Sequence, residues 1–194
     1  MLCKVFSAVC PELHYTSTHL LSELQREQVE TEAISSYTDS TSGNSSNNSN
    51  NHTNTEMKRF RIGFLSTNFF DHSIGRILVE LFIHLQHQII KQDNQKYALD
   101  VYVYGIDRRI PSDTTLNITN NIGNNIHSHI HDDVITYTLK HHLKENFLQI
   151  PENITSIRRV LTSAELDFLV FADVGMDFMT YQLAFSRFAQ YQVS

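Results

Sequence analysis

The spacing of hydrophobic positions changes several times after Lys58, which predicts strands alternating with helices. The short apolar run 60–65 is typical of a buried strand, and apolar residues then recur at helical spacing over about four turns in 74–90. After a polar break, the run 98–106 is rich in Val and Tyr and predicts a second strand. The connection between these two strands is long enough for the right-handed crossover that joins parallel strands.

The alternation continues to the end of the chain. The pattern predicts helices over 134–147, 153–163 and 179–188, and a buried strand over 166–171 with the sequence LDFLVF. Near-continuous apolar strands separated by helices indicate an α/β fold with a Rossmann-like parallel sheet and flanking helices.

Composition divides the chain into three zones. Residues 1–34 are predicted to hold one amphipathic helix, with Thr18 as a possible cap. Residues 35–57 are dominated by Ser, Thr, Asn and Gly, which bury too little apolar surface to offset the entropy of ordering, so a disordered linker is expected. Residues 58–194 are expected to form the Rossmann-like lobe.

Bulk composition excludes several classes of protein. A 194-residue chain with 41% hydrophobic and 19% charged residues is ordinary for one soluble globular domain. The net charge of −6, without a Lys/Arg cluster, argues against a nucleic-acid partner. The chain shows no secretory signal and no apolar run of the length of a membrane span, so we expect no membrane partner and a cytoplasmic or nuclear location.

His72 is the leading candidate for chemistry. It follows the first predicted strand and precedes a helix, which places it at the carboxyl end of the sheet, where open α/β folds bind ligands. A neutral imidazole there can accept a proton from an attacking hydroxyl, or donate a hydrogen bond to a sugar or phosphate. The competing interpretation is a turn histidine that caps or packs. Asp71 and Ser73 are the expected caps of the helix.

Three residues after the strand 166–171 are expected to line the same crevice: Asp173, Gly175 and Asp177. Gly175 permits close approach of the backbone to a ligand, and Asp177 is a predicted cap of the next helix.

A run of histidines suggests a metal hypothesis. His127, His129 and His131 would share one face of a strand next to Asp132 and Asp133, a possible weak site for zinc or copper. Structural metal sites usually gather their ligands from fixed turns, whereas this run lies in an Asn-rich segment, so no metal site is assigned.

Two segments, RFRIGFLSTNFFDHSIG and DFLVFADVGMDFMTYQLAFSRFAQYQ, together resemble the N-terminal catalytic lobe of the O-GlcNAc transferase and SPINDLY glycosyltransferases. The resemblance covers roughly residues 58–194. It implies the first lobe of a two-lobed transferase of the glycogen-phosphorylase type, with His72 catalytic and no cofactor beyond its donor substrate, UDP-GlcNAc or another nucleotide sugar such as GDP-fucose. The implied partners are the nucleotide sugar, acceptor proteins with Ser or Thr hydroxyls, and a C-terminal lobe beyond Ser194 that makes most of the diphosphate contacts.

The chain also departs from that family. Gly175, Met176 and Asp177 stand where members commonly have Gly-His-Thr or Gly-Tyr-Thr, and Gln190 stands where Pro is usual. The first 57 residues show no tetratricopeptide period. Two alternatives to an inactive fragment of a transferase stay open: a non-catalytic Rossmann-like binding module or pseudoenzyme remnant, and a metal-binding protein. A lobe without its partner is expected to leave apolar surface uncovered near its C-terminus.

Overall fold

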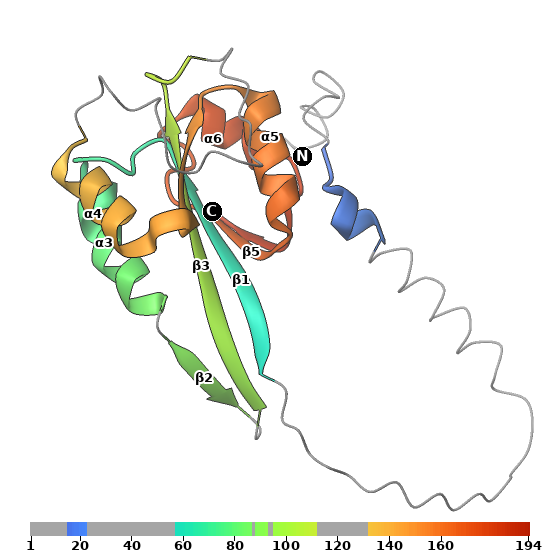
Figure 1. Ribbon diagram of the computed structural model, residues 1–194. Coiled ribbons are helices and arrows are strands. Elements are labelled where there is room, and N and C mark those ends of the chain that lie inside the picture. The colour runs from blue at the N-terminus through green and yellow to red at the C-terminus, as the bar shows by residue number, and fades with distance from the viewer. Residues whose placement is uncertain (1–14, 23–56, 87, 93–94, 112–131) are drawn as a thin grey trace, which may run out of the picture.

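The computed structural model describes residues 15–22, 57–86, 88–92, 95–111 and 132–194 (Figure 1). Six strands form one sheet: β1 Lys58–Ser66, β2 Ile89–Gln92, β3 Gln95–Asp107, β4 Phe147–Pro151, β5 Leu166–Phe171 and β6 Ala189–Val193. In the described residues four α-helices lie between these strands: α3 Ser73–Leu85, α4 Val134–Leu143, α5 Ile154–Ala164 and α6 Phe178–Leu183. A short 3₁₀ turn, Lys144–Asn146, links α4 to β4.

The strand order is β2-β3-β1-β5-β6, and β4 pairs with the carboxyl half of β3. All pairs are parallel except the β2–β3 hairpin. The chain therefore moves outward from β1 through β3 to β4, and then returns to the other side of β1 through β5 and β6. This reversal defines a switch point between β1 and β5, where α/β folds form a ligand crevice at the carboxyl ends of the strands. The Rossmann-like α/β fold predicted from the sequence is confirmed.

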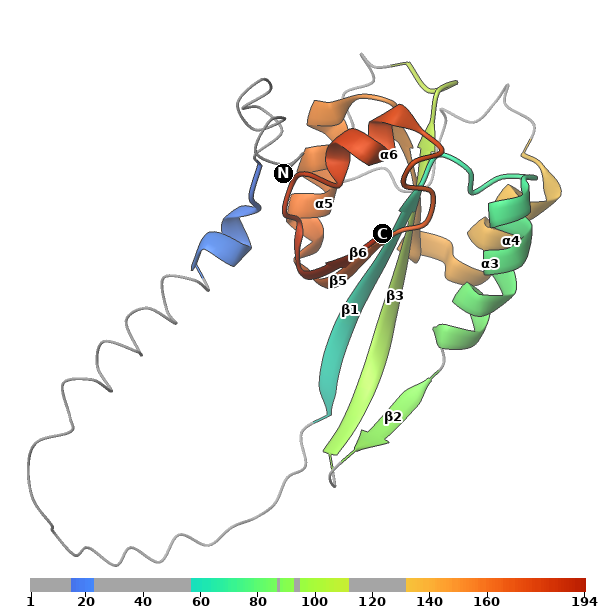
Figure 2. The ribbon, with the colours of Figure 1, turned by 180° about the vertical axis from the view of Figure 1, so that it is seen from behind.

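Helices cover both faces of the sheet. In both views α3 and α4 lie on one side, and α5 and α6 on the other (Figures 1 and 2). Two buried clusters result. The first, under α3 and α4, includes Phe64, Phe82, Val101, Val103 and Leu139. The second, under α5 and α6, includes Leu65, Ile150, Ile157, Leu169 and Leu183. Alternation along β1 sends Phe64 to one cluster and Leu65 to the other, as expected for a strand buried on both faces.

Three predicted helices extend too far. The helix predicted to Ile90 ends at Leu85, and Ile89 and Ile90 instead pair with β3 in a hairpin. The helix predicted over 134–147 ends at Leu143, because Lys144 adopts a φ of 52° that stops an α-helix, and Phe147 opens β4.

The helix predicted over 179–188 ends at Leu183, and β6 follows. The apolar residues that follow α3 and α4 fit strand and helix spacing equally well, so the periodicity alone did not separate them, whereas residues 184–188 form a turn that the helical spacing did not reveal.

The N-terminal segment 15–22 docks on the lobe. Ser17 N donates to Arg187 O at 2.8 Å, and Arg187 N donates to Tyr15 O at 2.6 Å. The Tyr15 ring lies 5.6 Å from that of Phe188. Residues 18–22 are helical and bury Leu20. The rest of the predicted N-terminal helix and the linker predicted at 35–57, apart from Met57, lie outside the described residues. No helix in the described part of the chain is long and apolar enough to cross a membrane.

The close packing of α3 on the preceding turn generates a prediction. A Cβ on Gly75 would overlap the carbonyl oxygen of Phe70 and lie 3.2 Å from that of Asn68, both of them backbone atoms that hold the turn. Ala is favoured over Gly by about 1 kcal/mol in a helix interior, but the overlap outweighs this gain. We expect Gly75→Ala to lower the free energy of unfolding by roughly 1–3 kcal/mol, measured by urea denaturation.

The matched control is Gly105→Ala. A Cβ there meets nothing closer than 3.6 Å, an ordinary contact with the Phe147 ring. Its effect should stay below about 1 kcal/mol. Equal losses in the two variants would contradict the close approach at Gly75.

Candidate functional site

A cavity of about 410 Å³ opens at the carboxyl edge of the sheet. Residues after β1, β3 and β5 border it, together with β4 and the start of α4. The side chains of Phe70 and Met176 are exposed and form an apolar rim around the cavity. The buried rings of Phe69 and Phe147 form part of its wall. Its polar lining includes Asn68, Asp107, Arg108, Arg109, Gln149 and Asp177. The position matches the crevice expected for the fold.

Asp173 joins the ends of β1 and β5 below this crevice. Its side chain is buried, and Oδ2 accepts four hydrogen bonds. Ser66 Oγ donates at 2.7 Å, whereas Thr67 N, Thr67 Oγ1 and Asn68 Nδ2 each donate at 2.9 Å. Ser66 Oγ in turn accepts from Asn68 N at 2.8 Å. The two segments that carry the family-like motifs are therefore bonded to each other.

Arg108 links three loops at the rim. Its Nε donates to both carboxylate oxygens of Glu152 at 3.0 Å, and Nη2 donates to Asp177 Oδ2 at 2.5 Å. Hydrogen bonding to Glu152, and the charges of both carboxylates, raise the pKa of Arg108. Asp177 also caps α6, because its Oδ1 accepts from Met179 N at 2.8 Å and Thr180 N at 3.2 Å. The predicted capping role of Asp177 is confirmed.

Arg109 is held by Asp107 in a two-pronged ion pair. Nε donates to Oδ1 at 2.9 Å and Nη2 donates to Oδ2 at 2.7 Å, while the backbone N of Arg109 donates to Oδ1 at 2.9 Å. Burial alone would raise the pKa of Asp107, but the hydrogen bonds and charge of Arg109 together outweigh burial and hold that pKa below its usual value. Both crevice arginines thus have carboxylate partners inside the protein.

His72 is the N-cap of α3 and does not border the cavity. Its Nδ1 faces Ile74 N and Ser73 Oγ, each at 3.4 Å, and the side chain is half-buried. The capping roles expected for Asp71 and Ser73 are wrong. Asp71 instead forms an ion pair with Arg76 at 2.6 Å, and Ser73 is the first residue of the helix.

Gly175 has a φ of 89°, a left-handed conformation that favours glycine, and a Cβ built on it meets no atom within 4 Å. It is exposed at the tip of the loop between β5 and α6. Of the four residues proposed from the sequence, only Asp177 borders the cavity. Asp173 lies beneath it, and Gly175 and His72 lie outside its lining.

Sequence reasoning missed the group formed by Asp107, Arg108 and Arg109. These residues directly follow the predicted strand 98–106, so the rule that ligands bind after parallel strands also selects them. The sequence did not indicate Glu152 as a site residue, because the short strand β4 that it follows was not predicted.

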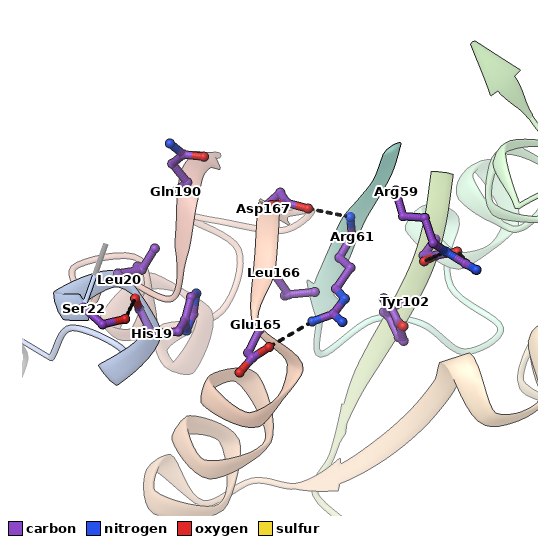
Figure 3. Close-up of a pocket in the computed structure, with 11 residues that line it drawn as sticks. His19, Leu20, Ser22, Arg59, Arg61, Tyr102, Glu165, Leu166, Asp167 and Gln190 are labelled. Carbon is purple, nitrogen blue, oxygen red and sulfur yellow. Dashed lines mark hydrogen bonds and ion pairs between the residues drawn. The ribbon is translucent and has the colours of Figure 1, made fainter. Parts of the chain in front are cut away.

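A larger hollow of about 700 Å³ lies at the opposite, amino end of the sheet (Figure 3). Its two arginines are paired with carboxylates of the same hollow, and Asp167 accepts a hydrogen bond from the backbone N of Arg61. Arg59 donates to Asp100 at 2.7 and 2.8 Å, and Arg61 Nη1 donates to Glu165 at 3.2 Å. The fold places ligands at the other edge, so size does not make this hollow the candidate site.

No group of three or more His, Cys, Asp or Glu suited to a metal occurs within the residues that the structure describes. His127, His129 and His131 lie outside those residues. His141 and His142 are exposed on α4.

No family model matches the chain, and no curated protein matches its sequence. Among solved structures, the chain is similar to a mutant of the O-GlcNAc transferase of Thermobaculum terrenum, with a TM-score of 0.40 and 18% identity. The similarity covers 70% of this chain and 20% of that chain, so the chain spans about a fifth of that structure. A similarity of this size defines neither a family nor an activity.

The four bonds to Asp173 predict that this carboxylate is a main source of stability for the edge. In Asp173→Asn the amide oxygen can replace Oδ2, but the negative charge that strengthens the four bonds is lost, and the amide NH₂ takes the buried place of Oδ1, which has no partner among the described residues. We expect a drop of roughly 2–4 kcal/mol in the free energy of unfolding, measured by urea denaturation. The control Asp167→Asn removes a carboxylate that accepts one bond, from Arg61 N at 2.8 Å, and should cost less. A smaller loss at Asp173 than at Asp167 would contradict the hub role.

The lowered pKa of Asp107 predicts an acid dependence. The folded state holds this pKa below the unfolded value of about 3.9. The Asp107 carboxylate therefore makes its full contribution to the free energy of unfolding above pH of about 3.9, and this contribution is lost as the pH falls through the folded pKa. We therefore expect Asp107→Asn to be less stable than the unchanged protein at neutral pH, and its stability to fall less steeply below about pH 4. Urea denaturation across that pH range measures both slopes, and identical slopes would exclude the ion pair as a source of stability.

Proposed function

We propose that the chain is the first lobe of a protein O-glycosyltransferase that uses a nucleotide sugar, and that acceptor proteins supply a Ser or Thr hydroxyl. One observation supports this most directly. The two segments resembling the family emerge at the same edge of one parallel sheet, at its switch point, bonded through Asp173. Antiparallel pairing of β1 and β5, or loops at opposite edges, would have ended this proposal.

In the proposed reaction the acceptor oxygen attacks the anomeric carbon of the sugar as the bond to the diphosphate breaks. The diphosphate leaves with the bonding electrons, the anomeric configuration inverts, and the hydroxyl proton passes to a base. The donor is UDP-GlcNAc or another nucleotide sugar, and we propose no further cofactor. We also propose a cytoplasmic or nuclear location.

The geometry of His72 favours one of its two possible roles. If Nδ1 accepts the amide hydrogen of Ile74, a neutral imidazole carries its proton on Nε2. Nε2 has no hydrogen-bond partner among the described residues, so it is available as a donor. We therefore propose that His72 Nε2–H donates to a sugar or phosphate oxygen of the donor substrate, and that another group takes the hydroxyl proton.

The electrostatics of the crevice support a dependence on a second lobe. Arg108 and Arg109 are the cations that line it, and carboxylates of the same lobe already neutralise both. A diphosphate would have to compete with Glu152, Asp177 and Asp107 for them. The phosphate charge is therefore assigned to the second lobe, and the isolated chain is expected to be inactive.

The ion pairs of Arg108 and Arg109 with carboxylates of the same lobe also favour a second candidate function, a non-catalytic binding module. A crevice with internally balanced charges, and a His72 that caps a helix outside the cavity lining, suits a lobe that only holds a neutral ligand or a protein. The third hypothesis, metal binding by the histidine run, has no supporting observation among the described residues.

Substitution of His72 separates chemistry from capping. His72→Ala removes both the imidazole ring and the N-cap of α3. His72→Asn keeps a good N-cap and removes only the Nε2–H group that is proposed to donate to the substrate. With the lobe joined to its second lobe, we expect transfer of labelled GlcNAc from UDP-GlcNAc to protein acceptors to fall roughly 100-fold in both variants. Thermal denaturation should show that only the Ala variant is destabilised.

Full activity in the Asn variant would reduce His72 to a capping residue. No transfer by the unchanged two-lobed protein would favour the binding module instead.

A further inference from the structure

Two amide side chains line the cavity at the carboxyl edge, and carboxylates fix how both are turned. Asn68 Nδ2 donates to Asp173 Oδ2 at 2.9 Å and to Thr67 Oγ1 at 3.2 Å. Gln149 Nε2 donates to Asp107 Oδ2 at 3.3 Å. An ionised carboxylate only accepts hydrogen bonds, so each amide must turn its nitrogen, and not its oxygen, toward the carboxylate.

The two amide oxygens are therefore the atoms left for a ligand. Neither Asn68 Oδ1 nor Gln149 Oε1 has a hydrogen-bond partner among the described residues. Asn68 Nδ2 is directed to Asp173 beneath the cavity, which leaves Oδ1 as the side-chain atom that Asn68 can present to the cavity. Two acceptors held in fixed orientations select a ligand that brings hydrogen-bond donors, such as hydroxyl groups.

The arginines of the cavity add N–H donors without adding net charge. Arg108 uses Nε and Nη2 for Glu152 and Asp177, and Arg109 uses Nε and Nη2 for Asp107. Nη1 of each arginine has no partner among the residues that the structure describes. A neutral hydroxyl can accept from such an N–H and donate to an amide oxygen at the same time. A phosphate, by contrast, would lie beside carboxylates that already neutralise both arginines.

The rim of the cavity offers an apolar surface next to His72. Phe70 is 41% exposed and Met176 is 65% exposed, and both border the cavity. The Phe70 ring lies 5.8 Å from the imidazole of His72, so a ring packed on Phe70 lies close to that imidazole. A pyranose has an apolar C–H face and an edge of hydroxyl groups, and a cavity of about 410 Å³ has the size of a small-molecule site.

We infer that this cavity is a subsite for an uncharged pyranose ring, and that Asn68 and Gln149 are its specificity-determining residues. Their oxygens accept hydrogen bonds from the ring hydroxyl groups, while the C–H face of the ring packs on Phe70. Phosphate groups stay outside the cavity. The inference rests on the proposed function in one respect, because it identifies this ring with the sugar of the donor substrate.

Titration of the full chain with N-acetylglucosamine, followed by protein NMR, tests the subsite. We expect saturable binding, and N-acetylglucosamine 1-phosphate should bind no more tightly. Gln149→Met removes both polar atoms of the amide at nearly constant size, and it should raise the dissociation constant roughly threefold to tenfold. The matched control Gln190→Met makes the same change on β6, at the hollow of the amino end, and should leave the dissociation constant unchanged.

Asn68→Leu tests the second acceptor and should weaken binding by a similar factor. This variant also removes a donor to Asp173, so circular dichroism must first show that it is folded. The Gln149 variant is less exposed to this problem, because it loses only the long contact of 3.3 Å with Asp107.

Three results would overturn the inference: no saturable binding of the sugar, tighter binding of the phosphorylated sugar, or equal affinities of the unchanged chain and Gln149→Met. None of them would contradict the proposed function, because transfer by the two-lobed protein is measured separately. Conversely, a two-lobed protein that binds the sugar through Gln149 and transfers none would contradict the transferase and support the subsite.

Discussion

The carboxylate of Asp173 is the interaction on which the carboxyl edge of the sheet depends. A buried carboxylate is costly to desolvate, and here four donors on Oδ2 offset part of that cost, while Oδ1 is buried without a partner among the described residues. Those donors come from the turn after β1, more than a hundred residues earlier in the chain. The turn that leads to His72 and α3 is therefore held by β5 as well as by its own backbone. Gly75 completes this arrangement, because the absence of a side chain lets α3 lie against the carbonyl groups of the same turn.

Around this anchor the lobe satisfies its own charges. Arg108 and Arg109 each contact carboxylates from loops that only the sheet brings together, so the crevice presents few unpaired charges to a ligand. Apolar groups, by contrast, stay uncovered at the rim, as at Phe70 and Met176, and at the outer strand β6.

The main elements of the fold followed from the sequence wherever packing and local preference agreed. The strand at 166–171 has the predicted bounds, and the helix at 153–163 is shifted by one residue, with Asn153 as its cap. Prediction failed where a short apolar run was compatible with two structures. Ile89 and Ile90 continue the helical spacing of α3, yet they pair with β3 because that long strand offers an open edge. The strand β4, which contains Phe147 and Ile150, was likewise not predicted, because a five-residue strand leaves little periodic signal.

The amino-acid sequence by itself determined the strands β1, β3 and β5, the presence of the four helices, the parallel α/β class, and the fact that His72, Asp173 and Asp177 all follow buried strands. Those properties depend on side-chain spacing over a few residues, which the sequence displays directly. Only the tertiary structure decided that Asp173 is a buried anchor, that His72 caps α3 outside the cavity, and that Arg108 joins Glu152 to Asp177. Each of these depends on which loops the sheet brings within hydrogen-bond distance, and that distance is set by strand order and register, which no local pattern encodes.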